Sequence, residues 1–227
     1  MRHLLHPLPE QAEIAIDSPI NHRLKRVLRL QVGQALTLCD GRGCTQEVRW
    51  QDKLFVPIAE VKKHLQLVPE LHLAPGVLKG ERQDWLVEKA SELGVDVLTP
   101  LLLDHGVVRV HDRAEKQARW QAIADGALEQ CGRTWRMVVA PPMPLAEWLT
   151  GNDGFFADET GGSLWQDLVR ERQKTPWRVT LGVEGGWSEK ERALLKSRNY
   201  RAISVGPLVL RAETAALAVA AIARANG

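Results

Sequence analysis

The chain has 227 residues, of which 44% are hydrophobic and 26% charged, and its formal net charge is +2. This composition is typical of a folded soluble protein with one large domain, or with one medium and one small domain. The low net charge does not by itself indicate a nucleic-acid-binding protein. No apolar run approaches the roughly 20 residues that span a bilayer, and the first residues lack the apolar stretch of a secretory signal. The three cysteines form no C-x-x-C pair, which predicts reduced thiols in a cytoplasmic protein without a metal site.

The first thirty residues predict one strand and one basic helix. Residues 13–17 alternate as a strand does, and Ser18 and Pro19 then offer an N-cap and a first helical position. The helix should end at Gly33, and its apolar face contains Ile20, Leu24, Val27 and Leu28. The opposite face carries four cations and no acid, namely Arg23, Lys25, Arg26 and Arg29. A merely solvated polar face is the alternative interpretation of this basic surface.

Three further segments predict the strands of a small β-barrel. They span residues 35–39, 44–51 and 54–61, and a hairpin-type turn at Asp40–Gly43 joins the first two. Pro69 and Pro75 then frame a segment that we interpret as a linker.

From residue 73 the pattern changes to alternating strands and helices. The predicted strands are 73–78, 95–103, 137–140, 155–157, 179–183 and 202–205, and the predicted helices are 83–93, 113–131 and 215–225. Such alternation predicts an α/β domain with a mostly parallel sheet covered by helices on both faces.

A glycine pair follows the predicted strand 179–183. The chain continues as Glu184-Gly185-Gly186-Trp187, and Ser188 and Glu191 have the spacing of a capping box, which predicts a helix start. Glycine lets the backbone approach a ligand closely, and ligands bind at the carboxyl ends of strands in open α/β sheets. The alternative is a tight turn that needs glycine only for its dihedral angles.

A second candidate segment, residues 204–214, leads into a helix that is apolar nearly all round. Arg211 and Glu213 stand directly before this helix. Such a helix must be buried in the core or against a partner subunit, and charges beside it are costly unless they are paired or used. The alternative is that both residues only cap and solubilise the helix start, where a glutamate suits the helix dipole.

Together the two segments resemble the closing motifs of the RsmE family, the 16S rRNA uridine-N3 methyltransferases of the SPOUT superfamily. That family typically has G-P-E-G-G-[FLW]-S-x-x-E followed by L-G-x-x-[IV]-L-R-x-E-T-A. The likeness includes residues 79–82, 84–95 and 129–133, and near the N-terminus residues 22–29 and 40–41. It therefore covers nearly the whole chain in the same order.

The resemblance implies an N-terminal PUA-like, RNA-binding β-barrel at residues 1–70 and a SPOUT methyltransferase domain at residues 73–227. It further implies a C-terminal trefoil knot, a homodimer with the knots at its interface, and methylation of the N3 of a specific uridine in the decoding-centre region of 16S rRNA. The substrate would be the rRNA or the assembled small subunit, and no metal is implied. The implied cofactor is S-adenosylmethionine, held by Leu181, Gly182, Glu184, Gly185, Gly186, Val205, Gly206, Leu208, Leu210, Arg211, Thr214 and Ala215.

The chemistry of this reaction assigns roles to the two charged residues. The uracil N3 is protonated at neutral pH, so the site must help remove that proton or stabilise the anion. We expect Arg211 to stabilise the developing negative oxygen and Glu213 to orient Arg211 or accept the proton. Arg23, Lys25, Arg26 and Arg29 would bind phosphates, with an affinity that falls steeply with salt.

The chain departs from the family pattern at three places. Val183 stands where proline is usual, Leu208 stands where a basic residue is frequent, and Leu103-Asp104-His105 replaces the usual Ser-Glu-Arg. The last change concerns residues that the family is thought to turn towards substrate, and His105 or Arg109 are the candidates to replace them. If this change abolishes methyl transfer, the chain is a non-catalytic RNA-binding protein. A nicotinamide oxidoreductase is disfavoured because the chain lacks G-x-G-x-x-G after its first strand, and a P-loop is absent too.

Overall fold

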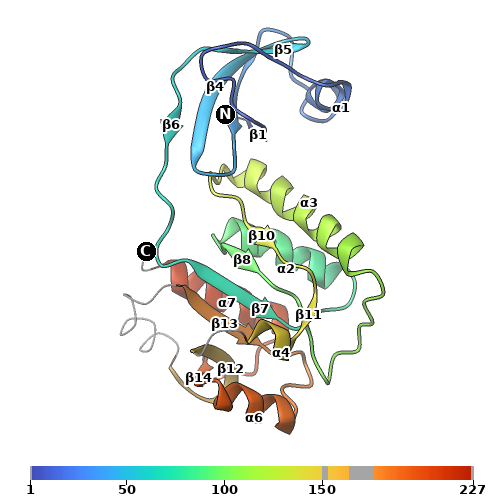
Figure 1. Cartoon of the computed structure of the whole chain (residues 1–227), viewed down its shortest axis with the longest axis vertical. Helices are drawn as coiled ribbons and strands as arrows, with labels where there is room; N and C mark the ends of the chain where they lie inside the picture. The colour runs from blue at the N-terminus through green and yellow to red at the C-terminus, as the bar shows by residue number, and fades with distance from the viewer. Residues whose placement is uncertain (1, 150–152, 164–175, 226–227) are drawn as a thin grey trace. The chain divides into compact units, whose positions relative to one another are not determined.

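The computed structural model describes residues 2–149, 153–163 and 176–225 of the chain (Figure 1). It divides into two compact units. The first unit comprises Met1–Gln66 and Leu128–Arg136, and the second comprises Leu67–Ala127 and Met137–Gly227. The segment Leu128–Arg136 lies far along the chain from the rest of the first unit, so the sequence pattern gave no sign that it folds there.

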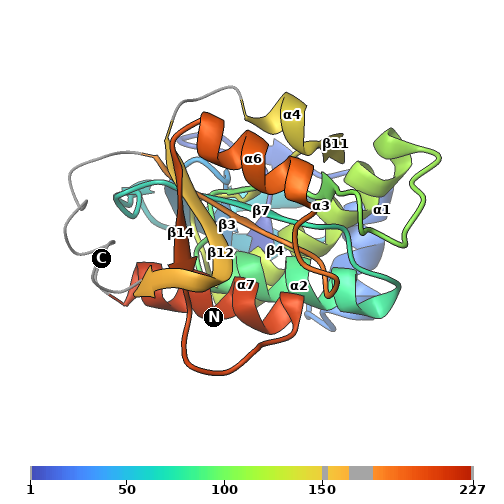
Figure 2. The ribbon, with the colours of Figure 1, turned by 90° about the horizontal axis from the view of Figure 1, so that it is seen from below.

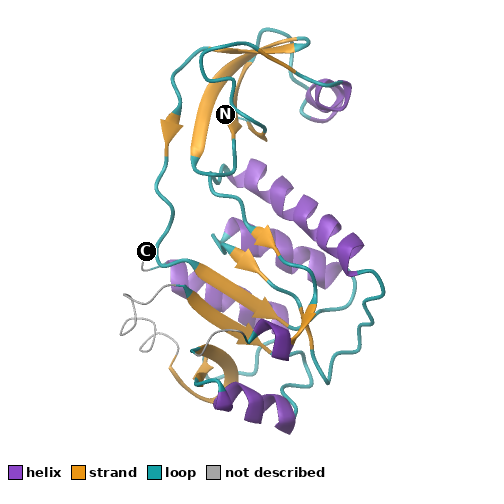
Figure 3. Cartoon of the chain, viewed as in Figure 1, coloured by secondary structure: helices purple, strands orange, loops and turns teal. Residues whose placement is uncertain are grey.

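The first unit is built on one mixed sheet (Figure 3). Its strands are β1 (His3–Leu5), β2 (Ile14–Ala15), β3 (Ala35–Cys39), β4 (Cys44–Gln51), β5 (Leu54–Pro57) and β6 (Lys62–Lys63). The strand order is β1-β3-β4-β5-β2, and β6 pairs with β4. Among the described residues β1 pairs only with β3 and β2 only with β5, so the sheet does not close on itself. The predicted hairpin turn is confirmed, because the Asp40 carboxylate accepts hydrogen bonds from the Arg42 and Cys44 amides at 2.7 and 2.9 Å.

The basic helix differs from its prediction in three ways. Its N-cap is Asp17 and not Ser18, because the Asp17 carboxylate accepts a hydrogen bond of 2.8 Å from the Ile20 amide. The helix α1 (Ser18–His22) then continues as one turn of π-helix, η1 (Arg23–Val27), and ends well before the predicted residue 33. The wider π turn rotates Val27 away from the core, which leaves that side chain 67% exposed although the helical period placed it on the apolar face.

The second unit is an α/β domain whose sheet is parallel throughout, as predicted. The strands of this sheet are β7 (Leu71–Pro75), β8 (Val97–Leu98), β10 (Val138–Val139), β12 (Gly154–Ser163), β13 (Trp177–Leu181) and β14 (Tyr200–Ser204). Their order is β10-β8-β7-β13-β12-β14, and a separate parallel pair joins β9 (Leu101–Leu102) to β11 (Met143–Pro144). The helices are α2 (Glu81–Glu92), α3 (Arg113–Cys131), α4 (Leu145–Trp148), α6 (Glu189–Ser197) and α7 (Ala212–Arg224).

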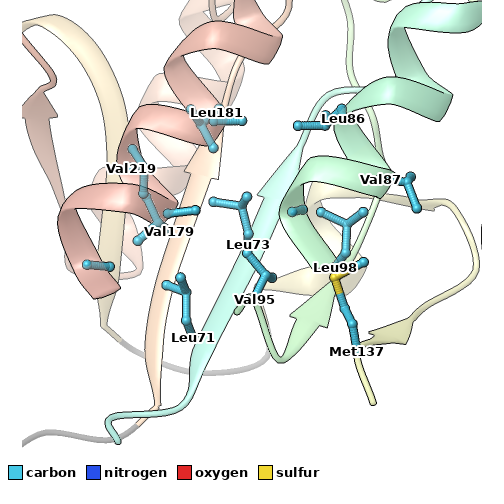
Figure 4. Packing of buried hydrophobic residues seen from close by; sticks show 14 of the residues in the cluster. Leu71, Leu73, Leu86, Val87, Val95, Leu98, Met137, Val179, Leu181 and Val219 are labelled. Carbon is cyan, nitrogen blue, oxygen red and sulfur yellow. The ribbon is translucent and has the colours of Figure 1, made fainter. Parts of the chain in front are cut away.

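The helices cover both faces of this sheet, as predicted. Figure 2 shows α6 and α7 on opposite sides of β12 and β14. On one face the core contains side chains from α2, α3 and α7, and in Figure 4 Leu73 of β7 lies between Val219 of α7 and Leu86 of α2. The other face packs against α4 and α6, and its cluster includes Phe156 and Leu195.

Two sequence predictions in this unit are wrong. The predicted strand 95–103 is two short strands, β8 and β9, because Pro100 between them has no amide hydrogen to continue the pairing. Pro75 does not end a linker but is the last residue of β7, where it stands opposite Leu181 of β13. The other predicted strands and helices of the unit exist, with ends shifted by a few residues.

Candidate functional site

A pocket of about 600 Å³ lies at the carboxyl ends of β13 and β14 and beside the middle of β12. Two chain segments supply most of its wall. The first is Leu181–Trp187, which we call the glycine turn, and the second is Ser204–Leu210 with Ala212 and Ala215, which we call the second wall. Pockets for small ligands occupy roughly 300–1,000 Å³ and lie at the carboxyl ends of strands in sheets of this kind. Its size and place therefore suit a small-molecule ligand.

The glycine turn is shaped by local hydrogen bonds and by one special dihedral. The Gly186 amide donates to the Val183 carbonyl at 2.8 Å, and Gly186 has a φ of +66°, which only glycine adopts without strain. The helix α6 begins directly after the turn. Its N-cap is Ser188, and the reciprocal hydrogen bonds with Glu191 complete the capping box that the sequence predicts.

The pocket contains most of the residues that the sequence predicts as cofactor contacts. Ten of the twelve line it, and Arg211 and Thr214 do not. The space in front of the backbone is open, because a Cβ atom added at Gly186 or at Gly206 would meet no atom within 4 Å. A bound molecule could therefore lie against the main chain of both walls, and the residues present fit a cofactor held largely by backbone groups.

Arg82 is a site residue that the sequence prediction missed. Its Nε donates to the Glu213 Oε1 at 3.0 Å, its Nη2 pairs with Glu213 Oε2, and its Nη1 pairs with Glu184 of the glycine turn. The hydrogen bond from Arg82 lowers the pKa of Glu213 although burial acts to raise it. Conversely, the hydrogen bond with Glu213 raises the pKa of Arg82 further above its usual range. Glu213 is thus an ionised carboxylate held by a cation from α2.

Arg211 and Glu213 lie side by side in the chain but face different surroundings. Glu213 is 7% exposed, whereas Arg211 is exposed and is the N-cap residue of α7. The charge of Arg211 also lowers the pKa of Glu213, less than the contacts with Arg82 do. The hydrogen bonds of the Glu213 carboxylate go to Arg82, and the expectation that Glu213 orients Arg211 stays a prediction.

The segment Leu103-Asp104-His105 lies against the outside of the glycine turn. The ring Nδ1 of His105 lies 2.9 Å from the Gly185 carbonyl oxygen, which can only accept, so Nδ1 donates. The Asp104 carboxylate accepts a hydrogen bond of 2.7 Å from the Ser188 hydroxyl, and the Asp104 amide donates to Glu191 at 2.9 Å. Two residues that depart from the family pattern therefore contact the glycine turn and the start of α6.

A second ion pair borders the pocket. Asp158, in the middle of β12, pairs with Arg192 of α6 and accepts hydrogen bonds from the Thr160 amide and hydroxyl at 3.0 and 2.7 Å. Burial acts to raise the pKa of Asp158, but these hydrogen bonds and the charge of Arg192 bring it below its usual value. The sequence predicts a buried strand at residues 155–157, directly before Asp158, but it does not indicate the ion pair.

In the first unit, the predicted basic surface is partly neutralised. Arg23 pairs with Glu129, and Lys25 lies 2.6 Å from Asp52, so only Arg26 and Arg29 of the four cations are exposed without an ion pair in the described part of the chain. The unit as a whole contains twelve Lys and Arg against eight Asp and Glu, a formal net charge of +4. The pairing identifies which two cations remain available to a polyanion.

Two further features are absent from the described ranges. No helix there is long and apolar enough to cross a membrane. The same residues contain no cluster of three or more His, Cys, Asp or Glu side chains that could hold a metal ion.

Comparisons with known proteins agree on one family. Residues 66–224 match the family model of the RNA methyltransferase domain. The ribosomal RNA small subunit methyltransferase E of Treponema pallidum is 44% identical over 232 residues, which cover 92% of this chain and 84% of that protein. The protein of the same name from Synechocystis is 28% identical over 228 residues, which cover 95% of this chain and 75% of that protein.

Solved structures give the same result. A ribosomal RNA small subunit methyltransferase E from Neisseria gonorrhoeae, bound to S-adenosyl methionine, superposes with a TM-score of 0.80 at 26% identity and covers 96% of this chain and 94% of that one. A methyltransferase from Legionella pneumophila in complex with the cofactor SAM reaches a TM-score of 0.83 at 28% identity, covering 100% and 97%. The chain therefore belongs to the ribosomal RNA small subunit methyltransferase E (RsmE) family, whose members are S-adenosylmethionine-dependent RNA methyltransferases.

Proposed function

We propose that this chain uses S-adenosylmethionine to methylate the N3 of one uridine in the decoding-centre region of 16S rRNA. The observation that carries the proposal is the pocket at the carboxyl ends of β13 and β14, whose two walls are the two segments of family likeness. The names of the relatives, which specify the small-subunit rRNA, support the RNA target. The Neisseria and Legionella structures, with their bound cofactor, support the methyl donor.

The backbone of the glycine turn and of the second wall would hold the cofactor. The open space in front of Gly186 and Gly206 supports this, since a side chain at either position would fill it. When bound, S-adenosylmethionine supplies an electrophilic methyl group. The protein has to stabilise the uracil anion. Arg211, which is exposed beside the pocket, is our candidate for the residue that stabilises the negative oxygen of that anion. The ion pair with Arg82 favours a positioning role for Glu213 over proton acceptance, because a carboxylate with a lowered pKa is a weak base.

We also propose that the first unit is a PUA-like RNA-binding domain and that the second is a SPOUT domain with a C-terminal knot, acting as a homodimer in the cytoplasm. The net positive charge of the first unit supports the RNA-binding role. Arg26 and Arg29 are the cations that we expect to contact phosphates. Replacing both with Gln should make the dependence of RNA binding on salt less steep. The magnitude of the slope of log K for RNA binding against log salt concentration should fall by roughly 1.5, because each lost phosphate contact removes about 0.7–0.9 from it. A variant with Gln at Lys196 and Arg198, two exposed cations of α6 and its end, is the matched control and should keep the slope.

The target nucleotide is tested with small subunits from a strain that lacks the gene. Incubation with the purified protein and S-adenosylmethionine should create a new stop in primer extension, because 3-methyluridine blocks the Watson–Crick edge. The same assay on naked 16S rRNA decides between free rRNA and the assembled subunit. If subunits from the deletion strain already contain the stop, the target assignment is wrong. RNA binding without any turnover would instead support the non-catalytic alternative.

A further inference from the structure

Arg82 lies outside both walls of the pocket, contacts one of them and contacts a residue beside the other. It belongs to the first turn of α2, 99 residues before Leu181, where the nearer wall begins. Its guanidinium reaches Glu184 in the glycine turn and Glu213 at the start of α7, between the second-wall residues Ala212 and Ala215. Among the described residues, no other side chain is shown bonding to both of these carboxylates.

We infer that Arg82 is a positioning residue for the methyl-donor site, which fixes the glycine turn relative to the start of α7 and so keeps the pocket in its binding shape. This inference rests on the proposed function, because it assumes that S-adenosylmethionine occupies this pocket. The glycine turn needs such a support. Its glycines give the backbone more conformational freedom than any other residue would, so its shape must be imposed from outside.

The geometry requires an arginine. Nε and Nη2 bind the two oxygens of Glu213 as a fork, and Nη1 remains to bind Glu184, so three nitrogens of one planar group set the relative position of two carboxylates. Lysine offers a single flexible ammonium group that cannot form the same fork. The Glu213 end is the more buried one, since the Glu213 side chain is only 9% exposed, whereas the Glu184 side chain in the glycine turn is 50% exposed.

The charges of the three side chains are the second reason to assign Arg82 a positioning role. Glu184 and Glu213 share one cation, so two carboxylates are brought to the same guanidinium. Without Arg82 the two carboxylates would repel each other, and the exposed one would turn towards solvent and take the glycine turn with it. Arg82 contacts the pocket lining at Glu184 but is not itself a lining residue, so we expect it to govern cofactor binding and not the methyl-transfer step.

The test compares Arg82→Gln, Arg82→Lys and the control Arg119→Gln. Arg119 is also an arginine paired with a carboxylate of α2, Asp84, but it is 58% exposed and is not among the residues that line the pocket. Calorimetry measures the Kd for S-adenosylmethionine, steady-state kinetics give KM and kcat, and thermal unfolding reports folding. We expect Arg82→Gln to raise Kd and KM roughly 10- to 100-fold with kcat nearly unchanged at saturating cofactor, Arg82→Lys to raise them less, and Arg119→Gln to change neither.

Each other result has a defined meaning. If Arg82→Gln binds the cofactor as tightly as the wild type, or lowers kcat with KM unchanged, the positioning role is wrong although the proposed function stands. If the wild type itself does not bind S-adenosylmethionine, the proposed function fails and the inference fails with it. Should Arg82→Gln not fold, Glu184→Gln replaces it, because this substitution breaks only the exposed half of the contact and must itself weaken cofactor binding several-fold for the inference to hold.

Discussion

Replacing Gly76 with alanine should lower the stability of this protein and distort the pocket in which we propose that the cofactor binds. Gly76 follows β7, and an added Cβ would lie 2.6 Å from Val183 Cγ1 and 2.8 Å from Leu103 Cδ1. Carbon atoms in contact lie about 3.5–4.0 Å apart, so Val183 and the glycine turn must move by roughly 1 Å. Overpacking of this kind costs about 1–3 kcal/mol, and the lower entropy of the unfolded alanine chain offsets about 0.4–1 kcal/mol of it. We expect a net loss of about 1–2 kcal/mol.

The assay is thermal unfolding combined with calorimetry of S-adenosylmethionine binding. In a chain of this size the loss corresponds to a fall in Tm of roughly 2–8 °C, and the displaced turn should weaken cofactor binding about tenfold. Adding Val183→Ala removes the closest clashing atom, so the two substitutions together should cost less than the sum of their separate effects. The control is Gly126→Ala within α3, where an added Cβ meets nothing within 4 Å and should stabilise by about 0.5–1 kcal/mol. A Gly76→Ala variant with the Tm and cofactor Kd of the wild type would refute the steric reasoning.

Three further predictions concern single side chains. Arg224→Met should destabilise the chain by about 3–5 kcal/mol in urea titrations, because it removes the cation that pairs with the carboxylate of Asp96, whose side chain is only 6% exposed. A loss of stability under about 1 kcal/mol would contradict this. Ser188→Ala should cost about 1 kcal/mol in the same titration by removing the N-cap of α6, and an unchanged midpoint would show that the cap contributes nothing. Cys39 is buried, and burial raises the pKa of its thiol, so iodoacetamide should modify the exposed Cys131 before Cys39. Mass spectrometry of the native protein after the reaction would disprove this if Cys39 were modified first.

The periodic and capped segments were the parts of the fold that the sequence could predict. The parallel α/β order, the helix start at Ser188 and the hairpin turn at Asp40–Gly43 follow from local chemistry that a short window contains. The π turn at Arg23–Val27 and the return of Leu128–Arg136 to the first unit depend on tertiary packing, which no local pattern records.

The candidate site divides along the same line. The two walls were predictable because their glycines and aliphatic residues form motifs that are contiguous in the sequence. Arg82 and the Asp158–Arg192 pair were missed, since each joins segments that only the folded sheet brings together. The sequence also assigned Glu213 a role beside its neighbour Arg211, whereas its hydrogen bonds go to a residue 131 positions away.

Three supports from outside the glycine turn together explain how a flexible loop can keep a defined shape. Gly76 leaves room for Val183, Arg82 holds Glu184, and His105 binds the Gly185 carbonyl. They come from the end of β7, the start of α2 and the loop after β9, so the turn is fixed by elements that precede it in the chain. In this protein, His105 stands where the family pattern has arginine, and its ring nitrogen donates a hydrogen bond to the turn. The departure therefore changes the group that could face substrate, and the histidine that replaces the arginine supports the shape of the glycine turn.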